Sequence, residues 1–373
     1  MAVTASPRPR DPTFDILKGL SILEVMTHHL LAAGMRKFAV QFDPMWWTMA
    51  TLSRILHFAV PTFLLVSAVL LARSVASKPR PDWKRFFSRR VQRTLWPYLL
   101  WTGGYIAFRL VWLRDQSDVT PTTMALPLSG SVSIPSLLTP ERLFINVFWG
   151  KAYYHIYFMV VLLQFSLLFP LLFAAMRRLR MSFGGALALG AVLQIVAFYM
   201  QRHWFTVPFP ASTVFWYCMP VIVGMWIGLN WQEWDAVWKR WRWAIAAIAV
   251  GGLAMYLPPA LMIYVGKPIS NELFHLGIKL YCIGIALLLL ALSTTIAKTQ
   301  RLSALLQRVG DRSIALFLIH PLVLFLLGGP KVTGFIERSP MPTITLGVVM
   351  FAITWGLSEA SRKTKADRVL FGR

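Results

Sequence analysis

The sequence predicts an all-α polytopic membrane protein with about ten transmembrane helices and both termini in the cytoplasm. Three observations predict this class. The 373 residues are 57% hydrophobic and only 14% charged, which is more apolar side chain than the core of a water-soluble protein holds. Apolar segments that span or nearly span a hydrocarbon layer of about 30 Å recur along the whole chain. The loops between these segments are alternately basic and nearly neutral.

We expect one membrane domain, residues 13–361, between a short N-terminal tail (1–12) and a basic C-terminal tail (362–373). We find no second soluble domain and no internal repeat that aligns by eye. Ten apolar segments make up the domain. Their approximate limits in chain order are 13–33, 48–72, 95–113, 153–175, 183–200, 212–230, 242–264, 274–296, 313–330 and 342–360.

The basic residues orient these ten segments. The formal net charge is +23, and Lys and Arg gather in every second loop. This positive-inside pattern holds over all ten spans and predicts that both termini are inside. No nucleic-acid-binding module accompanies the charge, so we expect no nucleic-acid partner. With a cytoplasmic N-terminus, the inner segments hold Arg8 and Arg10; the eight Lys or Arg of residues 73–93, both ends included; Arg177, Arg178 and Arg180; Lys239, Arg240 and Arg242; and Lys298, Arg301, Arg308 and Arg312.

Two loops differ from the rest in composition. The inner loop 73–93 enters the third span through WKRFFSRRVQRTLWPY, whose alternating aromatic and basic residues predict an amphipathic interfacial segment. This segment either sets topology and contacts anionic lipid, or binds a polyanionic ligand from the cytoplasm. The outer loop 114–152 contains a Ser/Thr/Pro-rich stretch, 116–140, and an apolar, aromatic piece, 141–150, too short to cross. That loop is either a cover over an outward-facing site or a plain connector.

The first apolar segment carries the most informative residues, because ionisable groups in hydrocarbon are costly and rarely idle. It contains Asp15, Lys18, Glu24, His28 and His29. Lys18 and His29 are eleven positions apart, so they lie within about 20° of one helical face and roughly 16 Å apart along the axis. Glu24 lies one turn before His28 and could orient its ring. An oriented imidazole with charged neighbours is what a general base requires.

The histidines of this chain are unevenly distributed. All seven fall in the middle or outer part of the predicted membrane domain, or just outside it. Arg54 and His57 share a face of the second segment near the depth of His29, while His155 opens the fourth segment and His320 lies in the ninth. A polar cavity open to the outside explains this distribution. For any one histidine a structural role is the commoner one, but His29 stands out through its charged neighbours.

Motifs for other chemistries are absent from the sequence. There is no HExxH or Cys/His cluster, and the adjacent His28 and His29 point about 100° apart on a helix, so we expect no metal. There is also no GxSxG elbow and no Gly-rich phosphate loop. Direct proton abstraction from a bound hydroxyl remains, with a donor molecule held by the cationic inner loop.

At these residues the chain resembles the acyltransferase-3 family of membrane O-acyltransferases. In the family's opening helix an acidic residue precedes Arg-Gly, and a His follows that Arg after ten residues; Asp15, Lys18, Gly19 and His29 occupy those places in FDILKGLSILEVMTHHL. Lys18 replaces the family's Arg and loses its bidentate fork, and Ala68 replaces a Gly and alters how closely helices approach. Four further segments of this chain resemble later helices of the family. They are VPTFLLVSAVLLAR (second helix), RRVQRTLWPYLLW (entry to the third), YYHIYFMVVLLQFSLLFPLL (fourth) and RSIALFLIHPLV (ninth).

The resemblance implies transfer of an acyl group, commonly acetyl or succinyl, from cytoplasmic acyl-CoA to a hydroxyl of an extracytoplasmic glycan or lipid-linked sugar. The start of the fourth helix is most similar to members that acylate extracellular polysaccharide. Acyl-CoA is then a co-substrate, and no cofactor is expected to be bound permanently. The other expected partners are the acceptor and the lipid bilayer, and the expected location is the inner (plasma) membrane.

The resemblance also divides the candidate residues between two substrates. His29 is expected to be the general base, with Lys18, Glu24 and Asp15 as its charged neighbours in the catalytic group. The residues expected to bind acyl-CoA are Arg85, Arg89, Arg90 and Arg93, and those expected on the acceptor side are His28, Arg54, His57, Tyr154, His155 and His320.

A transporter or flippase for a lipid-linked sugar or polysaccharide is the leading alternative, with the histidines and Lys18 as a proton or substrate path. Many carriers carry a recognisable internal duplication, which we do not find here, and a carrier has no evident use for the basic and aromatic inner loop. A structural subunit of a polysaccharide synthase is the third interpretation.

Overall fold

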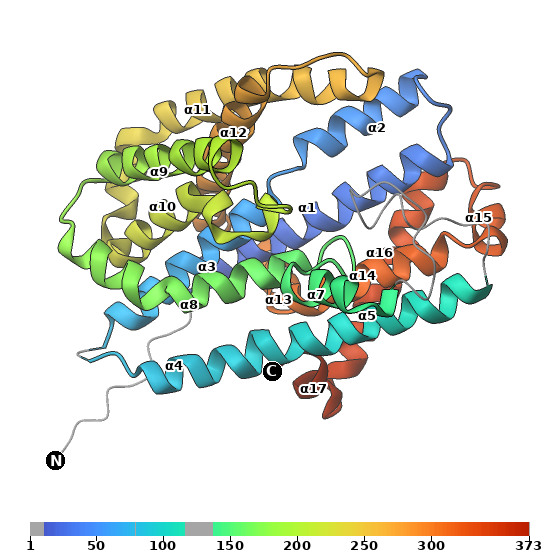
Figure 1. Cartoon of the computed structure of the whole chain (residues 1–373), viewed down its shortest axis with the longest axis horizontal. Helices are drawn as coiled ribbons and strands as arrows, with labels where there is room; N and C mark the ends of the chain where they lie inside the picture. Colours follow the sequence, from blue (N-terminus) through green and yellow to red (C-terminus); the bar gives the residue numbers. More distant parts are fainter. Residues whose placement is uncertain (1–10, 79, 116–136, 373) are drawn as a thin grey trace.

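Helices make up all of the secondary structure in the residues that the computed structural model describes, which are 11–78, 80–115 and 137–372 (Figure 1). The chain is therefore all-α, as predicted. The elements in chain order are α1 (Pro12–Lys37), α2 (Pro44–Ile55), α3 (Ala59–Ala76), α4 (Trp83–Arg90), η1 (Val91–Leu95), α5 (Trp96–Asp115), α7 (Pro140–Phe148), α8 (Tyr157–Arg178), α9 (Phe183–His203), η3 (Pro210–Ser212), η4 (Val214–Tyr217), α10 (Cys218–Leu229), η5 (Trp231–Glu233), α11 (Trp234–Met262), η6 (Ile263–Val265), α12 (Asn271–Ile296), α13 (Gln300–Asp311), α14 (Ser313–Leu327), α15 (Pro330–Ile336), α16 (Pro342–Arg362) and α17 (Ala366–Phe371).

The predicted number of membrane spans is only partly matched by long apolar helices. Within the described ranges, seven helical stretches are long and apolar enough to cross a membrane, and the bent pair α13 and α14 makes an eighth if it counts as one span. Helices form at all ten predicted places, but α5 is less apolar than these stretches, and η4 with α10 is shorter. The predicted count of ten is not confirmed, whereas repeated long apolar helices identify a multi-pass membrane protein.

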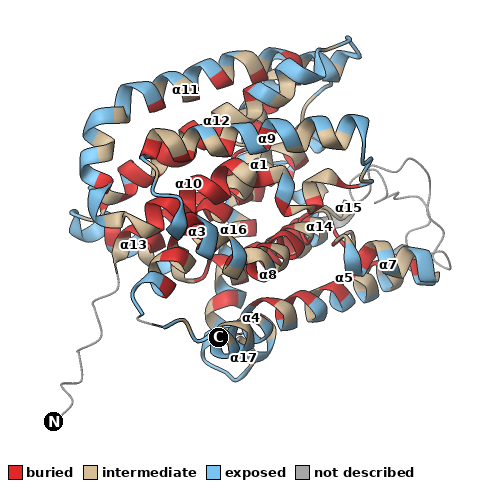
Figure 2. Cartoon of the chain, turned by 60° about the vertical axis from the view of Figure 1, so that its left-hand side comes forward, coloured by how far each residue is buried: buried red, intermediate tan, exposed pale blue. Residues whose placement is uncertain are grey.

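Helix α1 lies at the centre of the bundle. It packs against α2, α3, α12, α13, α14 and α16. Figure 2 shows buried positions gathered on the inner helices, including α3, α10 and α14, while α9 and α11 expose much of their length. The start of α1 is fixed by Asp11, whose carboxylate accepts a hydrogen bond from the Thr13 backbone N–H and pairs with Arg73 of α3 at 2.8 Å. The helix that carries the candidate residues is therefore anchored along its length.

Two glycines bring the backbones of α1 and α13 into direct contact. A Cβ on Gly19 would lie 2.4 Å from the backbone oxygen of Leu306, and a Cβ on Gly310 would lie 1.7 Å from the backbone oxygen of Asp15. No side chain fits at either position, because real Cβ atoms do not approach backbone this closely. In membranes such small residues allow the close packing that holds helices together.

The contact between α3 and α10 keeps its close approach although α3 carries Ala68. A Cβ on Gly224 would lie 2.9 Å from Cβ of Ala68, which is fully buried. Gly228 lies four residues later on α10, and a Cβ there would lie 2.4 Å from the backbone oxygen of Val69. Helix α10 therefore supplies a Gly-x-x-x-Gly face, and the glycine that α3 lacks is provided by its partner.

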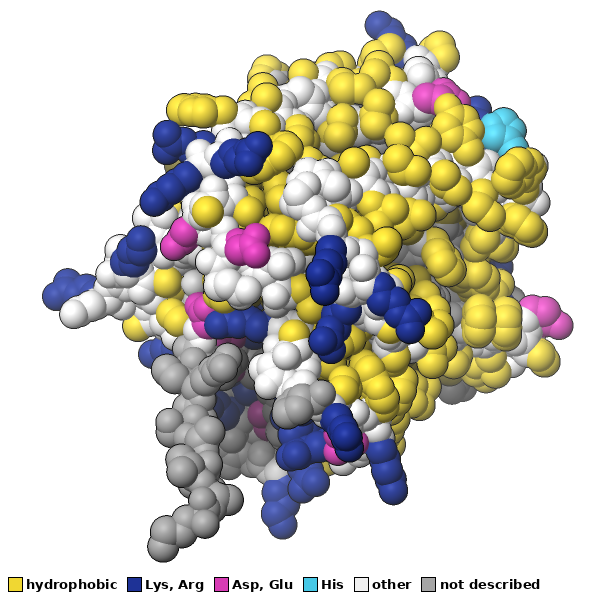
Figure 3. Space-filling model, turned by 90° about the vertical axis from the view of Figure 1, so that its left-hand side faces the viewer, with side chains coloured by type: hydrophobic (Ala, Val, Ile, Leu, Met, Phe, Trp, Pro, Cys, Tyr) yellow, Lys and Arg dark blue, Asp and Glu magenta, His cyan; other side chains and the backbone are white. Residues whose placement is uncertain are grey.

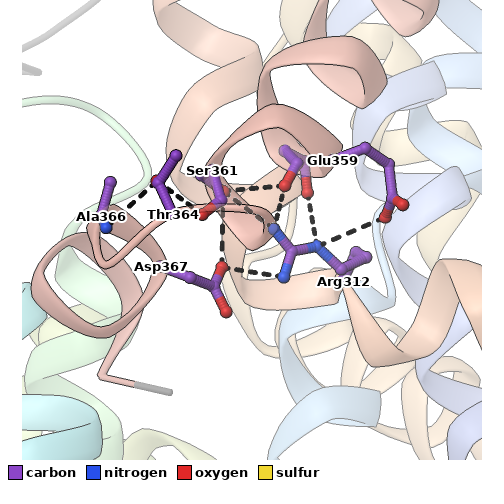
Figure 4. Close-up of polar contacts among 7 residues, drawn as sticks. Arg312, Glu359, Ser361, Thr364, Ala366 and Asp367 are labelled. Atoms are coloured by element: carbon purple, nitrogen blue, oxygen red, sulfur yellow. Dashed lines mark hydrogen bonds and ion pairs between the residues drawn. The ribbon is translucent and has the colours of Figure 1, made fainter.

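The chain bends by 68° between α13 and α14, and the buried Arg312 lies at the bend (Figure 4). Its Nε donates a hydrogen bond to the Ser358 hydroxyl at 2.8 Å, and its guanidinium pairs with Asp367 at 2.8 Å and lies 3.8 Å from Glu359. The sequence pattern predicts Arg312 among the basic residues of an inner loop. The structure instead makes it the link that joins the bend to α16 and α17.

The amphipathic inner segment is helical. Helix α4 continues through the π-helical turn η1 into α5. Phe86 stacks on Phe169 of α8, with 5.3 Å between ring centres, while Arg85 and Arg89 are exposed. Figure 3 shows Lys and Arg side chains gathered on one part of the face at the left-hand side of Figure 1, next to a hydrophobic expanse. One side of α4 thus packs on the bundle and the other is basic, as the pattern predicted.

The outer connection between α5 and α8 contains the short helix α7 in its apolar, aromatic part. Asn146 of α7 is buried, and the Tyr98 hydroxyl of α5 donates a hydrogen bond to the backbone oxygen of Val147. Most of the Ser/Thr/Pro-rich stretch 116–140 lies outside the described residues, which resume at 137. The hypothesis of a cover over the site therefore stays a prediction.

Candidate active site

A cavity of about 370 Å³, here called the histidine cavity, lies beside the second half of α1. Residues from α1, α2, α3, α12, α14 and the start of α8 line it. Except for His320, every residue predicted on the acceptor side is part of this lining. The polar lining residues are Glu24, His28, His29, Arg54, His57, Tyr154, His155, Tyr157, Tyr217, Tyr256, His275 and Lys279.

His29 lines the cavity from within a cluster of rings. Its ring centre is 4.6 Å from that of Tyr154 in an edge-to-face arrangement, 5.0 Å from His28 and 5.5 Å from His320 in a stack. His320 is fully buried, so it supports the His29 ring from within the protein. Packing on several sides fixes the orientation of an imidazole that remains open to the cavity.

The ring of His28 is oriented by Ser53 of α2 and not by Glu24. Its Nδ1 lies 2.8 Å from the backbone oxygen of Ser53 and 3.2 Å from the Ser53 hydroxyl. Neither carboxylate oxygen of Glu24 has a hydrogen-bond partner among the described residues. The predicted contact between Glu24 and His28 is therefore wrong: the helical spacing was correct, but a neighbouring helix offers the imidazole a closer acceptor.

Several buried polar atoms around the histidine cavity have no hydrogen-bond partner in the described part of the chain. They include both oxygens of Glu24, both ring nitrogens of His155 and Nε2 of His320. The Nδ1 of His320 lies 2.8 Å from the backbone oxygen of Leu316, and if it donates there its Nε2 is an acceptor. Buried polar groups are nearly always satisfied by protein, water or ligand. This cluster is therefore suited to polar groups that enter the cavity.

A second cavity, of about 280 Å³, lies beside the first half of α1 and is here called the basic cavity. Lys18, Arg90 and Arg93 line it together with the hydroxyl side chains of Ser67, Thr94 and Ser313. The Lys18 ammonium also forms an ion pair with Asp15 at 2.6 Å. Arg85 and Arg89 are exposed and do not line this cavity, so the structure brings together two of the four predicted arginines.

The charges at the basic cavity repel one another. Burial lowers the pKa of Arg90, and the neighbouring Arg93 and Arg89 lower it further. The residue stays protonated at physiological pH, because an arginine side chain does not lose its charge in proteins. An anion bound between Arg90 and Arg93 would relieve this repulsion, and hydrogen bonds to charged donors are stronger than neutral ones.

Phe317 of α14 lines both cavities. Its ring centre is 5.0 Å from His155, which faces the histidine cavity, and 5.6 Å from Phe158, which faces the basic cavity. Ser313, Phe317 and His320 lie at positions i, i+4 and i+7, so one face of α14 runs from the basic cavity to the histidine cluster. Among the described residues, Phe317 is therefore the one that the linings of the two cavities share.

Phe317 and Ser53 are two residues of the site that could not be predicted from the sequence. An apolar residue in an apolar helix gives no compositional signal, and the spacing of Ser313, Phe317 and His320 on one face of α14 was the one available indication. Ser53 could not be paired with His28 from sequence, because they lie 25 positions apart on different helices. Within the described ranges, no group of three His, Cys, Asp or Glu side chains is placed to hold a metal ion.

Fold and site together define a multi-pass membrane protein with two internal cavities that meet at one side chain, one rich in histidine and one cationic. A comparison with protein families matches residues 11–359 to the acyltransferase-3 family, described as an acyltransferase domain. The match covers most of the chain, and the chain belongs to this family of membrane acyltransferases. Neither the search of curated proteins nor the search of solved structures gives a match.

Proposed function

We propose that this protein transfers an acyl group, acetyl or succinyl, from cytoplasmic acyl-CoA to a hydroxyl of an extracytoplasmic glycan or lipid-linked sugar, in the plasma membrane. The observation that carries this proposal is the pair of cavities that meet at Phe317. One is cationic and suits the phosphates of CoA, whereas the other is lined by imidazoles and phenols and suits a saccharide. Transfer between two compartments needs two such binding spaces with a common wall.

The donor is proposed to bind in the basic cavity. Arg90 and Arg93 would hold phosphate groups of CoA at the cytoplasmic edge of this cavity. Lys18 lines the same cavity. The long, thin pantetheine arm would then extend along α1, whose residues between Lys18 and His29 cover roughly 16 Å at 1.5 Å per residue. This places the thioester beside Phe317, at the wall of the histidine cavity.

The acceptor is proposed to bind in the histidine cavity, with His29 as the general base. His29 accepts the proton of the sugar hydroxyl while the hydroxyl oxygen attacks the thioester carbonyl carbon. The new ester bond forms as the carbon–sulfur bond breaks, and the proton passes from His29 to the departing CoA sulfur. Enclosure of the site within the bundle limits the attack of water on the thioester.

Purified protein in detergent with labelled acyl-CoA tests this function. The proposal predicts release of free CoA that depends on a saccharide acceptor, and label that appears on the saccharide. Movement of a lipid-linked sugar across a membrane without consumption of acyl-CoA would contradict it and favour a carrier. Mass spectrometry of the labelled saccharide would identify the acyl group and the acylated hydroxyl in the same experiment.

A further inference from the structure

A third, mostly apolar crevice lies between α9 and α12, beside the histidine cavity. Its volume is about 160 Å³. Three of its lining residues, Trp216, His275 and Lys279, also line the histidine cavity. On the outer side, Ile195 of α9 and Leu276 of α12 line the crevice and are exposed on helices long and apolar enough to cross the membrane. The crevice therefore lies next to the histidine cavity and shares part of its wall.

One polar side chain in this crevice has no partner. Gln194 of α9 is only 4% exposed, and neither its Oε1 nor its Nε2 has a hydrogen-bond partner among the described residues. An amide buried without partners in the middle of a membrane helix is costly, so it indicates a polar group that arrives from elsewhere. A plain lipid-facing helix surface would gain nothing from a glutamine at this position.

The polar group would meet a cation at a similar depth. The ion pair between Arg202 and Glu272, at 3.6 Å, joins the end of α9 to the start of α12, so the two helices run antiparallel. Gln194 lies about 14 Å along α9 from its end, and Lys279 lies about 12 Å along α12 from its start, at 1.5 Å per residue. The Lys279 ammonium donates a hydrogen bond to the backbone oxygen of Trp216 at 2.7 Å, and both residues line the crevice and the histidine cavity.

We propose that this crevice is the lateral entrance for the acceptor, and that the acceptor is a sugar joined through phosphate to a lipid chain. The apolar chain lies in the membrane against α9 and α12, the phosphate lies between Lys279 and Gln194, and the sugar enters the histidine cavity. The positive charge of Lys279 and the amide donor of Gln194 complement a phosphate. This inference rests on the proposed acyl transfer and selects the lipid-linked acceptor over a free glycan.

A photoreactive farnesyl phosphate tests the crevice without any acyl transfer. In nanodiscs, the probe should label residues of α9 and α12 that line the crevice, as mapped by mass spectrometry, and an unlabelled polyprenyl phosphate should compete while phosphatidylglycerol should not. Leu276→Trp, which fills the crevice, should abolish the labelling. Leu292→Trp is the matched control, because Leu292 is an equally exposed leucine elsewhere on α12. Equal competition by phosphatidylglycerol would mean an ordinary bilayer lipid and would overturn the proposal.

Kinetics separate this inference from the proposed function. Leu276→Trp and Gln194→Leu should raise the KM for a lipid-linked acceptor severalfold and leave transfer to a short water-soluble saccharide unchanged. If both acceptors are affected equally, or neither is, the crevice is not the entrance although the enzyme remains an acyltransferase. If the wild-type protein shows no acyl transfer, the proposed function fails, and the photolabelling result then stands as a lipid phosphate site alone.

Discussion

His29 is the residue on which the proposed chemistry depends, and a substitution there tests it. His29→Ala should lower kcat for acceptor-dependent CoA release by about 10² to 10⁴, which is what general-base catalysis contributes. Binding of acyl-CoA should change little, because His29 lies in the other cavity. The exposed His203, outside both cavities, provides the control His203→Ala. A folded His29→Ala protein that keeps its rate within about tenfold would refute the base assignment.

The four arginines of the inner segment should differ in their effect on donor binding. Arg90→Ala and Arg93→Ala should each weaken acyl-CoA binding by about tenfold, since a hydrogen bond to a charged group contributes roughly 1.5 kcal/mol. The loss should shrink as salt rises, because salt screens such contacts. Arg85→Ala and Arg89→Ala are matched controls, exposed and outside the basic cavity. Isothermal titration measures all four variants. Unchanged affinity in Arg90→Ala and Arg93→Ala would leave these two arginines as topology signals only.

The candidate site residues could be predicted where their charge and their spacing along a helix single them out. The acidic, cationic and imidazole groups of α1 stand out because hydrocarbon penalises them, and Lys18 and His29 do line two cavities along one helix. Partners on other helices could not be predicted. Ser53 beside His28 and the burial of Arg312 both depend on which helices meet, and the local pattern around them contains no such information.

At the scale of helices, the contact between α1 and α13 depends on glycine. Gly310→Ala should destabilise the protein by about 3 kcal/mol or more, at or above the upper end of the usual cost of overpacking, because its Cβ would meet the Asp15 backbone. Gly356→Ala in α16 should leave stability nearly unchanged, since open space surrounds that position. Thermal melting in detergent measures the two variants side by side. Equal melting temperatures would show that α1 and α13 are not held this closely.

The positions of the helices could be predicted well from apolar periodicity, but their number as full spans could not. Helix α5 and the short helix α10 are apolar enough to appear as segments, yet whether a segment crosses the membrane depends on the neighbours that cover it. The bend between α13 and α14 could not be predicted either, because the sequence has no proline at the break. It is held by Arg312, whose partners on α16 and α17 come from 46 and 55 residues later in the chain.

At the scale of the molecule, Phe317 is the residue that the walls of the two cavities share. Phe317→Ala should join them and raise the rate of acyl-CoA hydrolysis without an acceptor, because water in the histidine cavity would then reach the thioester. Phe165→Ala is the control, since Phe165 is a fully buried phenylalanine that lines neither cavity. The release of CoA in the absence of saccharide measures the effect. Unchanged hydrolysis in Phe317→Ala, or an equal rise in Phe165→Ala, would show that the Phe317 side chain does not keep water from the thioester.

Transfer across the membrane is the central claim, and sealed proteoliposomes test it most directly. The protein is reconstituted with labelled acyl-CoA on one side only and a saccharide acceptor on the other side only. We predict that label appears on the saccharide in the opposite compartment while acyl-CoA stays on its own side, and that His29→Ala abolishes this transfer. Label found only on an acceptor placed in the same compartment as acyl-CoA would contradict the account.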